Sequence, residues 1–156
     1  MAIPDFVVDL RAAIGHAPLW LSGVTAVVVR DEHEVLLVRR ADTGAWTPVT
    51  GIIDPGEEPA VAGAREVLEE ADVVAVPERL AWVHVLPPMT YANGDQAQYL
   101  DLAFRFRYVS GEPAPADGEN TDARWFRSDE LPPMSDDMRE RITRCLVTQG
   151  AADFVA

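Results

Sequence analysis

The stretch from Gly51 to Val73 constrains the fold most, because it joins a tight turn directly to a helix. Residues 54–56 (Asp-Pro-Gly) are a strong turn signal, since proline presets one backbone angle and glycine accepts a conformation that other residues avoid. Residues 57–59 (Glu-Glu-Pro) are typical of a helix start. We therefore predict that a strand ends near Gly51 and that a helix follows over residues 59–71.

The predicted helix has one acidic face. At about 100° per residue, Glu66, Glu69 and Glu70 fall within a single turn. The small residues Ala62 and Gly63 lie one turn earlier, so nothing bulky is expected to cover the glutamates. We expect the helix to dock on a sheet through the opposite apolar face, formed by Val61, Ala64, Leu68 and Ala71.

Three carboxylates at this spacing repel one another, which raises their pKa values and weakens the helix. A divalent cation removes that cost, and oxygen-only ligands suit Mg²⁺ or Mn²⁺. The alternative interpretation is a solvated acidic face in a protein that is acidic throughout.

The same segment resembles the Nudix box, G-x5-E-x7-R-E-U-x-E-E-x-G-U, in which U is an aliphatic residue. Its positions are filled by Gly51, Glu57, Arg65, Glu66, Val67, Glu69, Glu70 and Val73. Asp72 stands where the pattern has glycine, and aspartate is among the few residues that tolerate the left-handed conformation needed there. The resemblance implies an α/β (α+β) fold, the Nudix α/β/α sandwich, with a mixed central sheet flanked by helices.

The length of 156 residues fits one domain with a sizeable core. We expect a single Nudix domain over residues 1–156, with its recognisable core at about 23–133. Helical patterns indicate an N-terminal helix over 4–14 and a C-terminal helix over 135–148. Alternating or β-branched runs predict strands over 23–30, 34–40, 80–86, 99–109 and 123–126.

The charge balance excludes some partners. There are 26 acidic and 13 basic residues, a formal charge of −13, which argues against a nucleic-acid polymer but not against a small nucleotide. Cys145 is the only cysteine, so no disulfide framework or zinc cluster is expected. The sequence has no secretory signal pattern and no apolar run long enough to span a bilayer. We expect a cytoplasmic protein without a membrane partner.

Candidate substrate-binding residues lie on two strands. The face of strand 99–109 that carries Asp101 and Arg105 either lines a pocket, with Arg105 facing phosphate and Asp101 facing a sugar or base, or is a solvated face with an Asp–Arg pair. In Nudix proteins an arginine at the end of the strand before the box often faces phosphate. Arg39 and Arg40 are the candidates, and only one can point inward. We favour Arg39, with two surface arginines as the alternative.

The resemblance implies metal-dependent hydrolysis of the pyrophosphate bond of a nucleoside diphosphate linked to another moiety, such as a nucleoside triphosphate, ADP-ribose or a nucleotide sugar. Glu66, Glu69 and Glu70 would hold the metal, and a further acid before Trp125, either Glu119 or Asp122, would add a ligand or general base. Arg65 would reach Glu57 and hold the carboxylates in register. The catalytic candidates are therefore Glu57, Arg65, Glu66 and Glu69, and a homodimer is possible because the family contains some.

Two other functions compete with this one. An isomerase acting on an isoprenoid diphosphate needs a catalytic cysteine, and Cys145 instead lies on the apolar stripe of the last helix. A catalytically inactive nucleotide-sensing module of the same fold usually lacks the glutamates, which are all present here. The sequence therefore favours an enzyme.

Overall fold

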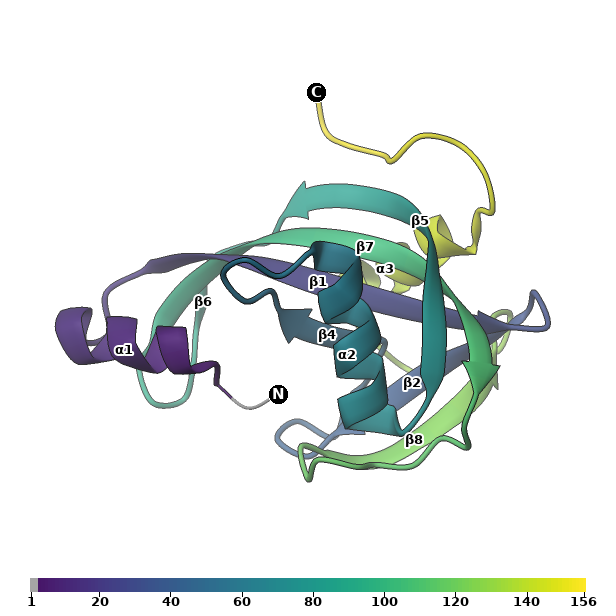
Figure 1. Ribbon diagram of the computed structural model, residues 1–156, viewed down its shortest axis with the longest axis horizontal. Helices are drawn as coiled ribbons and strands as arrows, with labels where there is room; N and C mark the ends of the chain where they lie inside the picture. The colour runs from purple at the N-terminus through teal and green to yellow at the C-terminus, as the bar shows by residue number, and fades with distance from the viewer. Residues whose placement is uncertain (1–2) are drawn as a thin grey trace.

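The computed structural model, which describes residues 3–156, contains a mixed β-sheet with helices on both faces (Figure 1). Strands follow the order β3-β2-β1-β7-β5, with β4 on β1, β6 on β7 and β8 on β2. Among the strands of residues 3–156, β1 and β7 pair in parallel and the other strand pairs are antiparallel. The elements are α1 (Asp5–Ile14), β1 (Leu19–Arg30), β2 (Glu34–Arg40), β3 (Trp46–Thr47), β4 (Val49–Ile52), α2 (Pro59–Ala71), β5 (Val74–Val85), β6 (Met89–Thr90), β7 (Gln96–Ser110), β8 (Asn120–Arg127) and α3 (Asp136–Leu146).

Alternate residues of β1 enter two separate core layers. Val28 belongs to the cluster that contains Val67 of α2, whereas Val27 and Val29 belong to the cluster that contains Ile142 of α3. Because neighbouring side chains on a strand point to opposite faces, α2 and α3 cover opposite sides of the sheet. The predicted mixed sheet flanked by helices is confirmed.

The predicted helix after the turn is confirmed, with α2 spanning Pro59–Ala71. Asp72 takes the left-handed conformation (φ 54°, ψ 34°) in place of glycine, and its N–H donates to the carbonyl of Leu68 at 3.1 Å. β2 has the predicted bounds, whereas β1, β5, β7 and β8 are longer than predicted. β5 begins at Val74 because the chain continues through irregular pairing around Pro77, which interrupts the alternating pattern in the sequence.

The predicted docking face of α2 is correct for Ala71, which is buried in the core, and for Ala64, which packs against it, but wrong for the other two residues. Val61 and Leu68 are 58% and 50% exposed, whereas Gly63 and Glu66 are among the residues buried against the sheet. A Cβ at Gly63 would lie 2.7 Å from the ring of Phe106, so only glycine lets the helix come this close. The small residues of α2 therefore let the helix pack closely on the sheet. This packing also buries two residues of the acidic face, Glu66 and Glu70.

α1 lies beside the β6–β7 hairpin at one end of the sheet (Figure 1). Arg11 of α1 donates to the carbonyl oxygens of Gln96 at 2.7 Å and Ala17 at 2.6 Å. Val7 packs in the same cluster as Leu21 and Tyr99. These contacts hold α1 against that end of the sheet.

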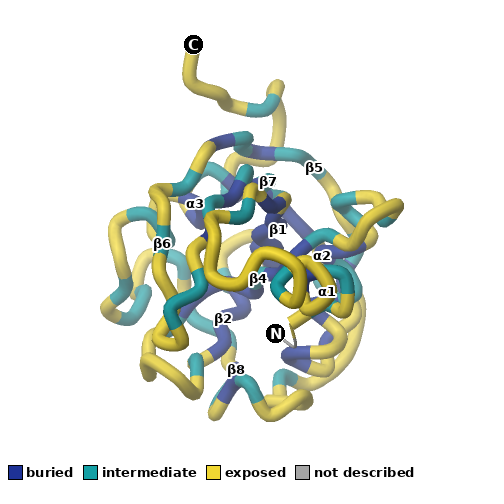
Figure 2. The backbone as a smooth tube through the Cα atoms, turned by 90° about the vertical axis from the view of Figure 1, so that its left-hand side faces the viewer, coloured by how far each residue is buried: buried dark blue, intermediate teal, exposed yellow. Residues whose placement is uncertain are grey.

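The backbone is most buried where β1, β7 and β4 meet, whereas the chain after α3 is largely exposed (Figure 2). Within residues 3–156 no helix has the length and apolar character needed to cross a bilayer.

Candidate active site

Arg65 lies at the centre of the acidic residues on α2. Its Nε donates to Oε1 of Glu57 at 2.9 Å, and its Nη2 donates to Oε2 of the same carboxylate at 2.9 Å. Its Nη1 donates to Oε1 of Glu66 at 2.9 Å and to Oε2 of Glu69 at 3.1 Å. One planar guanidinium therefore links the turn to two carboxylates of the helix, as predicted for this arginine.

These carboxylates differ in their surroundings. Hydrogen bonding to Arg65 lowers the pKa of Glu57. Burial raises the pKa of Glu66 even though Arg65 acts in the opposite direction. Glu69 is exposed. The Arg65 guanidinium therefore stabilises the ionised form of Glu66, because burial alone disfavours charge.

Gly51 of β4 makes room for the Glu66 carboxylate. A Cβ on residue 51 would lie 2.4 Å from the side chain of Glu66, closer than any relaxed contact. The glycine of the motif therefore has a steric role, because its missing side chain leaves room for the Glu66 carboxylate beside β4.

We expect Gly51→Ala to lower turnover by about 100-fold, because the added methyl group displaces the Glu66 carboxylate by more than about 1 Å. The free energy of unfolding should fall by only about 1 to 3 kcal/mol, the usual cost of overpacking a buried site. Steady-state kinetics and urea denaturation of the purified variant measure the two effects. Unchanged turnover in a folded variant would show that the position of Glu66 is unimportant.

A second acidic cluster surrounds Glu70. Oxygen atoms of Glu70, Asp117 and Glu119 all lie within 4.8 Å of one another. Asn120 donates from Nδ2 to Oε2 of Glu70 at 2.9 Å, and burial raises the pKa of Glu70 to about 7. A buried carboxylate with two further acids beside it offers the oxygen-only ligand set that Mg²⁺ and Mn²⁺ prefer, so the residues fit a divalent cation.

The loop between β7 and β8 brings this cluster together. The N–H groups of Ala114 and Ala116 donate to the carbonyl oxygens of Ala71 and Glu70 at the end of α2. Asp117 was not predicted, although it lies only two residues before the predicted Glu119 in an acidic loop. Asp122, the alternative to Glu119, instead pairs with Arg124.

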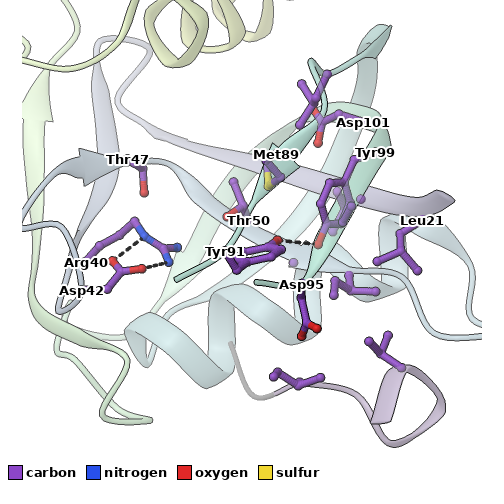
Figure 3. Close-up of a pocket in the computed structure, with 18 of the residues that line it drawn as sticks. Leu21, Arg40, Asp42, Thr47, Thr50, Met89, Tyr91, Asp95, Tyr99 and Asp101 are labelled. Carbon is purple, nitrogen blue, oxygen red and sulfur yellow. Dashed lines mark hydrogen bonds and ion pairs between the residues drawn. The ribbon is translucent and has the colours of Figure 1, made fainter. Parts of the chain in front are cut away.

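A cavity of about 470 Å³ joins the two acidic groups, since Arg65, Glu66, Glu69, Asp117 and Glu119 all line it. A larger cavity of about 630 Å³ lies next to it, between α1, the β6–β7 hairpin and the ends of β1 and β4 (Figure 3). Glu119 lines both cavities. Ile3 also lines both, so the acidic cavity and the larger one meet at Ile3 and at the Glu119 carboxylate.

The preference for Arg39 is wrong, because Arg40 is the one of the two candidates that lines the larger cavity. Arg40 donates from Nε and Nη2 to the two carboxylate oxygens of Asp42 at 2.9 and 2.6 Å (Figure 3). Arg39 is exposed and donates to the carbonyl of Gly44. The pairing of β2 with β8 shifts register between the two arginines, a local irregularity that alternation along the strand does not predict.

Asp101 and Arg105, predicted to share a face of β7, have separate positions. Asp101 lines the larger cavity and is only 2% exposed. Arg105 lies under α3, where it donates to Glu78 at 2.9 Å and Glu32 at 3.1 Å, and it lines neither cavity. The interpretation as a solvated face is wrong, and the structure does not bring Arg105 to the other candidates.

Cys145 also lies apart from both cavities. Its thiol is fully buried against the sheet in the α3 layer, and burial raises its pKa to about 12. This position gives the cysteine no access to a diphosphate near α2.

The turn, the α2 carboxylates and the mixed sheet together define a Nudix-type domain. Residues 20–145 match the family model described as the NUDIX domain. The chain is 32% identical over 114 residues to a MutT-like protein of Streptomyces ambofaciens, which covers 73% of this chain and 68% of that protein. The chain therefore belongs to the Nudix hydrolase family.

Two further comparisons show how much of each protein is shared. The NAD-capped RNA hydrolase NudC of Vibrio cholerae is 33% identical over 130 residues, covering 82% of this chain but 45% of that protein. This chain thus corresponds to less than half of that relative. A crystal structure of a MutT NUDIX hydrolase from Burkholderia pseudomallei matches with a TM-score of 0.65 at 26% identity, over 81% of this chain and 98% of that one.

Proposed function

We propose that this protein hydrolyses the pyrophosphate bond of a nucleoside diphosphate linked to another moiety, with Mg²⁺ or Mn²⁺ as cofactor. The observation that carries the proposal is the acidic cavity, in which Arg65 orders Glu57, Glu66 and Glu69 beside the Glu70 cluster. Concentrated, partly buried carboxylates destabilise a fold unless they are used to bind cations.

Each residue has a proposed part in the reaction. Glu70, Asp117 and Glu119 are the ligands best placed to hold the cation, with Glu66 and Glu69 lining the same region. When bound, a divalent cation supplies charge for the phosphates and lowers the pKa of a coordinated water. Arg65 fixes the orientation of the carboxylates, Arg40 offers a guanidinium toward a phosphate, and Glu119 is the candidate to accept the proton from water.

The substrate is proposed to be a small nucleotide rather than a capped polymer. The relative from Vibrio cholerae is named as an NAD-capped RNA hydrolase, but this chain has a formal charge of −13 and would repel a long phosphate backbone. NAD, ADP-ribose, nucleotide sugars and nucleoside triphosphates are therefore the compounds to test. A nucleotide-sensing module is the second candidate, but the full set of motif glutamates disfavours it.

A nucleotide panel tests the proposal. The purified protein is incubated with each compound in Mg²⁺, in Mn²⁺ and in excess EDTA, and chromatography detects monophosphate products. We expect turnover of at least one compound, loss of turnover in EDTA and recovery when the cation is restored. Saturable binding of a nucleotide without turnover under any of these conditions would instead identify a sensing module.

A further inference from the structure

The lining of the larger cavity includes a buried carboxylate that lies beside a glycine. Asp101 of β7 lies opposite Gly23 of β1, and a Cβ at residue 23 would lie 3.6 Å from Oδ1 of Asp101. Both residues line the cavity. The Cβ of any larger residue at position 23 would be in van der Waals contact with this carboxylate oxygen. The glycine therefore leaves that side of the carboxylate uncovered.

This carboxylate has few hydrogen-bond partners. Thr25 Oγ1 lies 3.0 Å from both oxygens of Asp101, but a hydroxyl donates only one hydrogen. Arg141 and His84 lie 3.6 and 3.8 Å from Oδ2, too far for a hydrogen bond. An ionised carboxylate has about four acceptor positions. Arg141 therefore balances its charge and leaves acceptor positions available.

The walls of the cavity favour a flat ring over a sugar. They are mainly apolar, including Leu21, Ile52 and Met89, and two tyrosines add aromatic surface. The hydroxyl groups of Tyr91 and Tyr99 are bonded to each other at 2.7 Å (Figure 3), which uses one of their two O–H donors. A sugar would bring hydroxyl groups against the apolar part of these walls, whereas a planar heterocycle can pack on it and present one polar edge.

The position relative to the acidic cavity suits a nucleoside. Asp101, Gly23 and Ile52 are neighbours across three adjacent strands, β7, β1 and β4. Two strand spacings separate the outer pair by about 10 Å. Ile52 and Gly51 are neighbours on β4 and face opposite sides of the sheet: Glu66 lies against Gly51 on the α2 side, whereas Asp101 lies on the α3 side beside Arg141. Glu119 lines both the acidic cavity and the larger one, so a nucleotide whose phosphates lie near Glu119 can place its base in the larger cavity, on the Asp101 side of the sheet.

We propose that Asp101 determines which substrate the protein accepts, and that its carboxylate accepts a hydrogen bond from the amino group at the edge of a nucleobase. This inference rests on the proposed function, because it places the base of the same nucleotide whose diphosphate is cleaved. The proposed hydrogen bond predicts that the substrate is a nucleotide whose base carries an amino group.

Paired nucleotides that differ by one amino group test the inference. Guanine is compared with hypoxanthine and adenine with unsubstituted purine, in whichever nucleotide class the protein hydrolyses. We expect kcat/KM to favour the amino form by about 10- to 100-fold in at least one pair, the value of a hydrogen bond to a charged group in a buried site. In Asp101→Asn this ratio should fall to within a few-fold, mainly through KM. Equal kcat/KM values within both pairs, or an unchanged ratio in Asp101→Asn, would overturn the inference while leaving hydrolysis intact.

Two further variants separate recognition from support of the fold. Asp137→Asn removes a carboxylate that pairs with Arg141 but does not line the cavity, so the amino preference should persist. An equal loss of preference in this variant would mean that Asp101 acts only through the buried network, which overturns the inference. In Gly23→Ala the added methyl group covers one side of the Asp101 carboxylate. This variant should lower the preference for the amino form, which provides a test even if Asp101→Asn fails to fold. Calorimetry with the paired monophosphates gives the same comparison without turnover, so it judges the base assignment even if no compound is hydrolysed.

Discussion

Glu70→Gln should lower turnover by at least about 100-fold, because the substitution removes the buried anionic ligand of the proposed cation site. The fold should be retained. The glutamine carbonyl can accept the hydrogen bond that Asn120 now donates to Glu70, and the side chain keeps its size. Steady-state kinetics in saturating Mg²⁺ measure the loss. Wild-type turnover in Glu70→Gln would remove this residue from the ligand set.

The same variant should change how the stability of the cation-free protein depends on pH. Burial raises the pKa of Glu70 from 4.5 to about 7, so the folded protein holds this proton more tightly than the unfolded chain. The stabilisation is present below about pH 4.5 and is lost as pH rises through about 7, a loss of about 3 kcal/mol at most. Glu70→Gln keeps a neutral group at every pH and should therefore be more stable than the wild type at pH 8.

Urea denaturation in EDTA at pH 5 and pH 8 measures this difference. Glu112→Gln is the matched control, because it removes an exposed acid from the loop that carries Asp117. The control should follow the wild type at both pH values. If Glu70→Gln also loses the same stability as the wild type between pH 5 and pH 8, the buried charge of Glu70 is not the cause. Adding Mg²⁺ at pH 8 should stabilise the wild type more than Glu70→Gln.

Local sequence spacing predicted the parts of the site that depend on local structure. The turn and the start of α2 fix the distance between Glu57 and Arg65, so their contact follows from eight residues of known geometry. The same reasoning failed for half of the predicted docking face of α2, since Val61 and Leu68 are exposed. Periodicity counts apolar side chains, whereas the contact with Phe106 depends on the absence of a side chain at Gly63.

The remaining parts of the site depend on strand pairing that one sequence does not reveal. Glu119 reaches Glu70 because β8 pairs with β2 and the preceding loop caps α2. Arg141 lies beside Asp101 only because α3 covers that face of the sheet. Each of these contacts joins residues at least 40 positions apart, beyond the range of helix or strand periodicity.

Arg65→Ala should lower the free energy of unfolding by about 3 kcal/mol at pH 8, because it leaves a buried carboxylate without its cation. Glu66 is 4% exposed and receives a hydrogen bond from Arg65 at 2.9 Å. Its pKa, already raised by burial, should rise further in the variant, since the opposing effect of Arg65 is gone. Stability that depends on a raised carboxyl pKa is present at low pH and lost as pH rises, so the deficit of Arg65→Ala should be smaller at pH 5.

A double-mutant cycle in EDTA separates this cause from the loss of packing around the arginine. Glu66→Gln removes the charge that Arg65 balances, so Arg65→Ala should cost much less in a Glu66→Gln background. The predicted coupling is at least about 1 kcal/mol at pH 8. Repeating the cycle with Glu69→Gln provides the control, because Glu69 is exposed and its pair with Arg65 should contribute little. Additive effects of Arg65→Ala and Glu66→Gln would mean that the arginine stabilises the turn through Glu57 alone, and its proposed role in ordering the helix carboxylates would be lost.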